Sequence, residues 1–182
     1  MQSFRFTLVL AASLSCCLIA PPGWRDFASP DGKFEAKFPF EPKTTEVKTA
    51  TGPLKSYLAT SGTTYFGVSV CSLPDVQNPS AEAENQLLDS TRDAVVTIVR
   101  GKLLKETKID LEKQTRVWWA RFNIRCPGRE LLIQLNDNKG QARYRLYVVE
   151  GQLYQVYYGT SDSDAAKSKD ADTFFDSFKL KN

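Results

Sequence analysis

The sequence predicts an α+β fold: an antiparallel sheet of roughly six to nine strands in hairpins and a meander, with one long helix and a short C-terminal helix packed on it. Two observations carry this prediction. Apolar and polar side chains alternate along three consecutive stretches between residues 126 and 159. The long helical stripe, within residues 81–100, lies between groups of strands, whereas helices of parallel folds alternate with single strands.

The first strands are expected to form hairpins. Phe34, Ala36 and Phe38 alternate after Ser-Pro-Asp-Gly at residues 29–32, a sequence that favours a tight turn. The charged, threonine-rich residues 44–50 are typical of an edge strand that resists pairing with other molecules. The strands expected here are residues 24–27, 34–38, 44–50, 54–60 and 64–71.

The long helix is expected to begin after Ser80, which can cap it, and to stop at Gly101. Its apolar stripe is about one face wide, so the helix should pack on a sheet and expose its other side. The stripe consists of Leu87, Leu88, Thr91, Ala94, Val95 and Ile98.

The second half of the chain is expected to supply the centre of the sheet. A strand at residues 102–111 precedes a turn at 112–114, and residues 117–124 form a further strand. Pro127-Gly128 favours another turn. Glu150-Gly151 favours a type I turn with a bulge, because Glu150 disfavours positive φ. The meander strands are residues 131–135, 142–149 and 153–158, and after a cap cluster at 161–164 a short helix brings in Phe174, Phe175, Phe178 and Leu180.

Residues 1–20 are predicted to be an export signal. Arg5 precedes an apolar run that is shorter than the ~20 residues of a membrane-spanning helix. Two interpretations of its processing stay open: a lipoprotein signal in which Cys16 or Cys17 is lipidated, or a simple cut near Ala20. Residues 21–182 then form a single domain in the periplasm or cell envelope, or secreted, with the membrane reached only through such an anchor.

Composition excludes several kinds of function. Removing residues 1–20 takes away one arginine and no acid, so the formal charge falls from +3 to +2, which argues against a nucleic-acid partner. The chain has no histidine, which excludes Ser-His and Cys-His catalysis, and we expect no cofactor or metal. Glu130 and Asp137 could form a carboxylate pair, but we favour an ion pair of Glu130 with Arg129 and a turn role for Asp137.

The sequence allows two interpretations for each of two further residue pairs. Cys71 and Cys126 are either a disulfide, which export permits, or two unpaired buried cysteines. Trp118 and Trp119 are neighbours on a predicted strand and point to opposite faces. The outward one is the best candidate for a partner contact, and a ring covered by the N-terminal hairpin is its alternative.

Arginines and tyrosines share one face of the meander. Arg143, Arg145 and Tyr147 alternate on one strand, and simple hairpin register adds Tyr154 and Tyr158. Such a pattern can bind nucleic acid. Because the charge is near neutral, we favour a face covered by a helix, with the arginine stems lying on aromatic rings.

Three motifs in order carry a resemblance to a known family. They are Trp24-x-x-Phe27 with the turn at 29–32 and Phe34-x-x-x-Phe38-Pro39, then Pro127-Gly128-Arg129-Glu130, then Phe174-Phe175-Asp176-Ser177-Phe178. In these the chain resembles the PsbP/Mog/DcrB-like domains, small exported or accessory α+β domains, over nearly all of residues 24–180. Residues 113–124 look like an insertion. The resemblance implies the fold far more than a function, and it implies no catalytic residues.

These observations predict a non-catalytic exported or membrane-anchored binding or accessory domain, with a protein or a small ligand as its partner. The alternative is a hydrolase-like enzyme that uses paired carboxylates in a cleft.

Overall fold

The computed structural model describes residues 23–31, 33–49, 52–73, 79–117, 120–135, 140–161 and 164–181. The helices are α1 (Ala81–Ile98) and α2 (Lys169–Ser177), with a short 3₁₀ turn η2 (Ala165–Lys167). The strands are β1 (Arg25–Ala28), β2 (Phe34–Phe38), β3 (Lys43–Thr49), β4 (Gly52–Ser61), β5 (Thr64–Ser72), β6 (Lys102–Val117), β7 (Ala120–Gln134), β8 (Gln141–Val149), β9 (Gln152–Thr160) and β10 (Lys179–Leu180).

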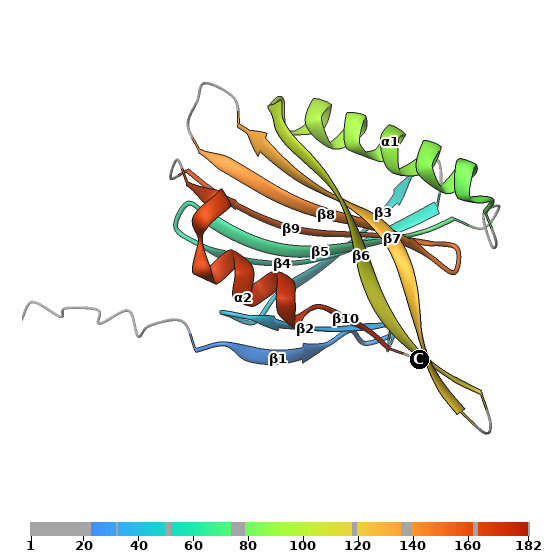
Figure 1. Ribbon diagram of the computed structural model, residues 1–182. Helices are drawn as coiled ribbons and strands as arrows, with labels where there is room; N and C mark the ends of the chain where they lie inside the picture. The colour runs from blue at the N-terminus through green and yellow to red at the C-terminus, as the bar shows by residue number, and fades with distance from the viewer. Residues whose placement is uncertain are drawn as a thin grey trace, which may run out of the picture.

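These elements form three layers (Figure 1). A seven-stranded antiparallel sheet of order β3-β4-β5-β9-β8-β7-β6 lies in the middle. α1 covers one face, and α2 with a three-stranded sheet of order β1-β2-β10 covers the other. The predicted α+β class, the long helix and the short C-terminal helix are confirmed, and the described part holds ten strands.

The small sheet brings the two ends of the domain together. β2 pairs with β1 on one side and with β10 on the other. Ser29 fixes the turn between β1 and β2, because its hydroxyl accepts hydrogen bonds from the backbone N–H groups of Lys33 (2.9 Å) and Phe34 (3.1 Å). The alternation of buried and exposed residues along β2 is as the sequence predicted.

The meander β7-β8-β9 is confirmed, but its two predicted turns differ from the structure. Pro127-Gly128 lies inside β7, opposite β6. Gly128 is required there by close packing, since a Cβ at this position would lie 2.5 Å from both the Tyr147 ring and the Leu146 carbonyl oxygen. Glu150 and Gly151 both have positive φ (50° and 70°), which is a type I′ turn and not type I.

α1 begins as predicted and ends earlier than predicted. The Ser80 hydroxyl accepts from the backbone N–H of Ala83, and the last helical residue is Ile98. Arg100, with φ 49°, takes the left-handed position that we assigned to Gly101. The N–H of Gly101 donates to the Val96 carbonyl at 3.0 Å, which closes a Schellman motif.

The buried stripe of α1 is narrower than predicted. Leu88, Thr91 and Val95 are buried, whereas Ile98 is 79% exposed. The partly buried Val96 and Val99 pack against the sheet in its place. The helix is therefore rotated slightly from the orientation that the sequence suggested.

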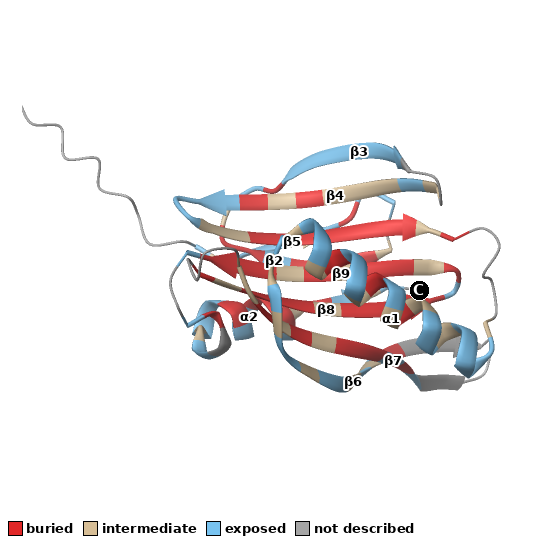
Figure 2. Ribbon diagram, turned by 90° about the horizontal axis from the view of Figure 1, so that it is seen from above, coloured by how far each residue is buried: buried red, intermediate tan, exposed pale blue. Residues whose placement is uncertain are grey.

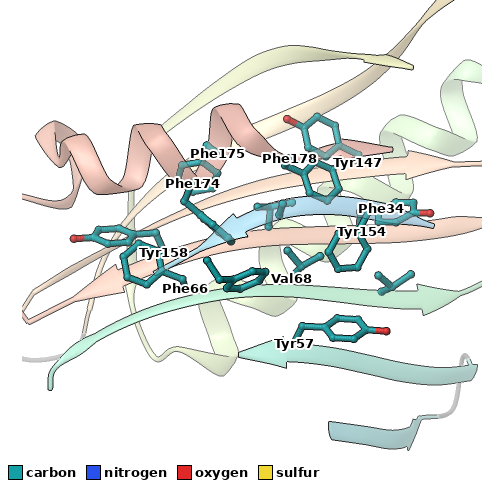
Figure 3. Packing of buried hydrophobic residues seen from close by; sticks show 14 of the residues in the cluster. Phe34, Tyr57, Phe66, Val68, Tyr147, Tyr154, Tyr158, Phe174, Phe175 and Phe178 are labelled. Carbon is teal, nitrogen blue, oxygen red and sulfur yellow. The ribbon is translucent and has the colours of Figure 1, made fainter. Parts of the chain in front are cut away.

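Two apolar clusters lie on opposite faces of the seven-stranded sheet. The cluster under α1 is aliphatic in large part, with Leu88, Leu131 and Leu146 fully buried. The other cluster is mainly aromatic, and Figure 3 shows Phe174 directed at Phe66 between α2 and the sheet, with the two ring centroids 5.5 Å apart. The buried centre of the sheet and its exposed edge strand β3, which was predicted as an edge, are visible in Figure 2.

The C-terminal phenylalanines close the aromatic cluster as predicted, although the helix cap differs. Phe174, Phe175 and Phe178 are buried. Ser168, and not the cluster at residues 161–164, caps α2, because its hydroxyl accepts from the backbone N–H of Ala171.

Cross-strand glycine–tyrosine pairs recur in the sheet. Tyr157 is the register partner of Gly67, and Tyr65 is the partner of Gly159. In both pairs the tyrosine ring occupies the space of the missing Cβ, with the nearest ring atoms 2.2 Å and 2.0 Å from the position of an added Cβ. Gly128 and Tyr147 on β7 and β8 repeat the arrangement.

The predicted export signal, including Cys16 and Cys17, lies outside the described residues. Neither helix of the described part has the length and hydropathy that crossing a membrane would require.

Candidate functional site

β6 and β7 continue past the point where β8 ends. In the described ranges, residues 110–117 of β6 and 120–127 of β7 pair with each other and with no third strand. Figure 1 shows this two-stranded ribbon leaving the sheet beside the C-terminus. The turn predicted at residues 112–114 is wrong, because β6 runs through it and Lys113 lies opposite Ile124.

The base of the ribbon is fixed by packing and by one ion pair. Cys126 belongs to the aromatic cluster, and the partly buried Leu111 packs against it. The Lys113 ammonium lies 2.6 Å from a carboxylate oxygen of Glu150 in the β8–β9 turn. Because an isolated two-stranded hairpin is only marginally stable in water, these base contacts hold the ribbon on the sheet.

Two open hollows flank the Lys113–Glu150 ion pair. The first, of about 280 Å³, lies toward the start of α1. The second, of about 320 Å³, lies toward β10 and includes Lys33, Gln152 and Lys181. The first combines apolar with ionisable side chains: Ile124, Pro127, Val148 and Val149 with Glu84, Lys113, Arg125, Cys126 and Glu150.

The ionisable groups of the first hollow do not form an activated nucleophile. Burial raises the pKa of the Cys126 thiol, Lys113 opposes this, and Glu84 and Glu150 add to it. The thiol therefore stays protonated at neutral pH, whereas reactive cysteines have a lowered pKa. Burial also raises the pKa of Glu84, against the opposing charge of Arg129.

The arginine face of β8 is covered by α2, as predicted. The guanidinium groups of Arg143 and Arg145 lie 5.0 and 4.8 Å from the centroid of the Phe175 ring. Glu130 accepts from Arg145 at 2.6 Å and from Arg143 at 3.4 Å. Arg143 also donates to Asp172 on α2 at 2.7 Å. These arginines hold the helix on the sheet.

The favoured pairing of Glu130 with Arg129 is wrong, because neighbouring residues on a strand point to opposite faces. Arg129 lies on the α1 side, where it is 3.2 Å from Glu106 and donates to the Asn85 side chain at 2.6 Å. Asp137, the other member of the carboxylate pair considered from the sequence, lies outside the described residues.

Cys71 and Cys126 lie far apart. Three strand spacings separate β5 from β7, about 14 Å at the usual spacing, and a disulfide needs Cα atoms within about 7 Å. The two residues also belong to clusters on opposite faces of the sheet. A bridge between them does not fit this fold, so of the two alternatives we retain two thiols.

Trp118 and Trp119 lie outside the described residues. In the sequence they stand between Val117 and Ala120, the last register pair of the ribbon. Sequence reasoning missed Lys113 and Glu150, which it assigned to two separate turns. The one available signal was that Glu150 is an unusual residue before Gly in a two-residue hairpin turn.

A larger open hollow of about 730 Å³ lies between the small sheet and α2. Several of its polar groups are engaged within the fold: the backbone N–H of Lys37 donates to the Ser177 hydroxyl at 2.8 Å. That hydroxyl donates in turn to the Phe174 carbonyl at 2.6 Å. We therefore place the candidate site at the ribbon and its base.

No protein-family model matches the chain, and no curated protein sequence matches it. Among solved structures, the chain is similar to the solution structure of cyanobacterial PsbP (CyanoP) from Synechocystis sp. PCC 6803, with a TM-score of 0.56 and 13% sequence identity. The match covers 92% of this chain and 98% of that chain. At this identity the likeness concerns the fold alone, and it is the fold that the three sequence motifs implied: the chain has a PsbP-like fold.

Proposed function

We propose that this protein is a non-catalytic, exported or membrane-anchored binding or accessory domain that contacts a protein partner through the ribbon. The observation that carries the proposal is the ribbon itself, a paired extension beyond the sheet whose two strands are joined in sequence by Trp118 and Trp119. Tryptophan is among the residues that most often dominate binding energy at interfaces. Ile124, on the same ribbon, is 47% exposed.

The chemistry of the described residues supports a binding role over a catalytic one. The buried arginines of the sheet are paired with Glu106, Glu130 and Asp172, so these acids are engaged in ion pairs within the fold. The Cys126 thiol has a raised pKa and therefore lacks the thiolate character of a nucleophile. The resemblance of the sequence to accessory domains points the same way.

One observation favours the enzyme alternative. Glu84 and Glu150 line the same hollow, and the raised pKa of Glu84 is a property that carboxylic general acids share. A hydrolase of this kind would lose turnover of a chromogenic ester or glycoside on Glu84→Gln substitution without loss of folding. Turnover that is removed by this substitution would replace our proposal with the enzyme.

The test is affinity capture from a membrane extract of the source cell, quantified against variants. Trp118→Ala and Trp119→Ala are compared with Val47→Ala, whose side chain is 57% exposed on the far edge strand β3. We expect at least one tryptophan variant to keep its thermal unfolding midpoint and to lose a partner that the Val47 variant retains. Equal capture by all stable variants would contradict the role of the ribbon.

Export and anchoring are tested on the mature protein. A lipidated Cys16 or Cys17 would add the mass of acyl chains and cause partition into detergent. A free chain that begins near Pro21 would show the simple cut instead.

A further inference from the structure

The Lys113 side chain is 8% exposed, and its ammonium is paired with a carboxylate that is itself 70% exposed. A buried ammonium is costly unless an anion accompanies it. Here the anion is the Glu150 carboxylate, which lies on the solvent side. Because this side chain is largely exposed, few packing contacts restrain it. The structure thus defines a carboxylate position on Lys113 that can be vacated by rotation of one exposed side chain.

Glu150 occupies its turn at a conformational cost. Its φ of 50° lies in the left-handed region, at a type I′ position where Asn, Asp and Gly are preferred. Non-glycine residues in this region cluster at functional sites. The ion pair to Lys113 is the contact that the structure gives in return.

The hollow beside this ion pair matches a ligand with an apolar body. Ile124, Val148 and Val149 line it together with two prolines. Its volume of about 280 Å³ lies near the lower limit of small-molecule pockets, about 300 Å³. With Glu150 rotated away, the charges that remain on its lining are Lys113 and Arg125 against Glu84, a net excess of one cation.

We propose that this hollow binds an amphipathic monocarboxylate, an apolar group that carries one carboxylate, which replaces Glu150 on Lys113. The inference rests on the proposed function in that the base of the ribbon is a binding surface, and it names the ligand chemistry there. The apolar C-terminus of a polypeptide and a small organic acid share this chemistry.

The experiment is a titration of the purified mature protein with hexanoate, followed by NMR chemical shifts or calorimetry. Glu150→Asn removes the competing carboxylate and places a residue that type I′ turns favour. We expect this variant to bind hexanoate about tenfold more tightly than the parent protein, since a charged hydrogen bond no longer has to be broken. Lys113→Met should abolish binding, while Lys108→Met, at an exposed position on the same strand, should leave it unchanged.

Both variants should stay folded, which thermal unfolding checks. Methionine replaces the stem of Lys113 with similar volume, and the carboxylate that it leaves without a partner, Glu150, is 70% exposed to water. Hexanoate binding by Lys113→Met at the parental affinity would overturn the proposal. So would the absence of tightening in Glu150→Asn, or the absence of binding to either protein at millimolar concentrations.

A second arm separates the two ligand sources. An acetylated Leu-Val peptide with a free carboxylate is compared with its amidated form. Tighter binding of the free peptide than of hexanoate, lost on amidation, assigns the site to a polypeptide C-terminus; equal or weaker binding assigns it to a small acid. The hexanoate titration uses only purified protein, so its result does not depend on whether the tryptophan variants lose a partner in the capture experiment. The two proposals can therefore fail separately.

Discussion

Substitution of Glu130 by Gln tests how much the ion pairs between β7 and β8, beneath α2, stabilise the protein. Glu130 is the shared carboxylate of two arginines whose side chains are only 9% (Arg143) and 21% (Arg145) exposed. Removing one partner of a fully buried pair typically costs about 3–5 kcal/mol. Arg143 keeps Asp172 at 2.7 Å and Arg145 keeps the exposed Asp176 at 3.6 Å, so we expect a smaller loss of about 2 kcal/mol in the free energy of unfolding.

The assay is urea unfolding followed by circular dichroism, with the double variant Glu130→Gln/Arg145→Met completing a cycle. Methionine removes the charge of Arg145 and keeps a stem on the Phe175 ring, so the double variant should be more stable than the sum of the two single changes. Glu112→Gln, an exposed acid of the ribbon, should change stability by less than about 0.5 kcal/mol and serves as the control. An additive cycle would refute the coupling of Glu130 with Arg145 and leave this ion pair without a contribution to stability.

Three further predictions follow from the packing of the sheet and its cysteines. Gly128→Ala should lose about 1–3 kcal/mol of stability in the same urea assay, because the added Cβ would lie 2.5 Å from the Tyr147 ring. Burial raises the pKa of Tyr147 from 10.0 to about 12, with Arg145 opposing. The folded protein therefore holds this proton more tightly than the unfolded chain: the contribution to stability is complete below pH 10 and is lost as the pH rises through about 12, and Tyr147→Phe should flatten the loss in that window. Thiol titration of the unfolded mature chain should give the same count for Cys71 and Cys126 with and without reductant, and a difference of two would restore the bridge.

Most strands could be predicted because their signals are local. Alternation marks β2 and the meander, and the Ser80 hydroxyl that caps α1 is evident from its position before the helical stripe. The burial of Phe174 and Phe178 followed from composition at the end of the chain. In each case the residues that decide the structure are neighbours in sequence.

The two wrongly predicted turns of the meander share a cause, which is that a distant strand is involved in the local conformation. Pro127-Gly128 has the composition of a turn, yet the ring of Tyr147 on β8 requires glycine in a straight strand. Glu150 adopts positive φ while its carboxylate pairs with Lys113. Nothing near these residues in the sequence reports those partners.

The same difference between local signals and distant partners explains why only part of the candidate site was predicted. The packing of Arg143 and Arg145 on aromatic rings under a helix followed from alternation and simple register, and the structure places them on Phe175. Lys113 and Glu150 were missed because their contact depends on β6 continuing through a segment that resembles a turn. The length of β6 is set by its pairing with β7, which only the fold reveals.

In each glycine–tyrosine pair across the sheet, the residue that one position can accept depends on the residue at the other. The three pairs are Gly67 with Tyr157, Gly159 with Tyr65, and Gly128 with Tyr147. In each pair the glycine has no side chain, and the tyrosine ring of the neighbouring strand occupies that space. A larger residue at the glycine would collide with the tyrosine ring, so we expect it to be tolerated where the tyrosine is replaced by a smaller residue. Among diverged sequences of this fold, we expect the large and the small residue of such a pair to change places across the strands. The combined side-chain volume of the pair should stay similar, even where overall identity is low.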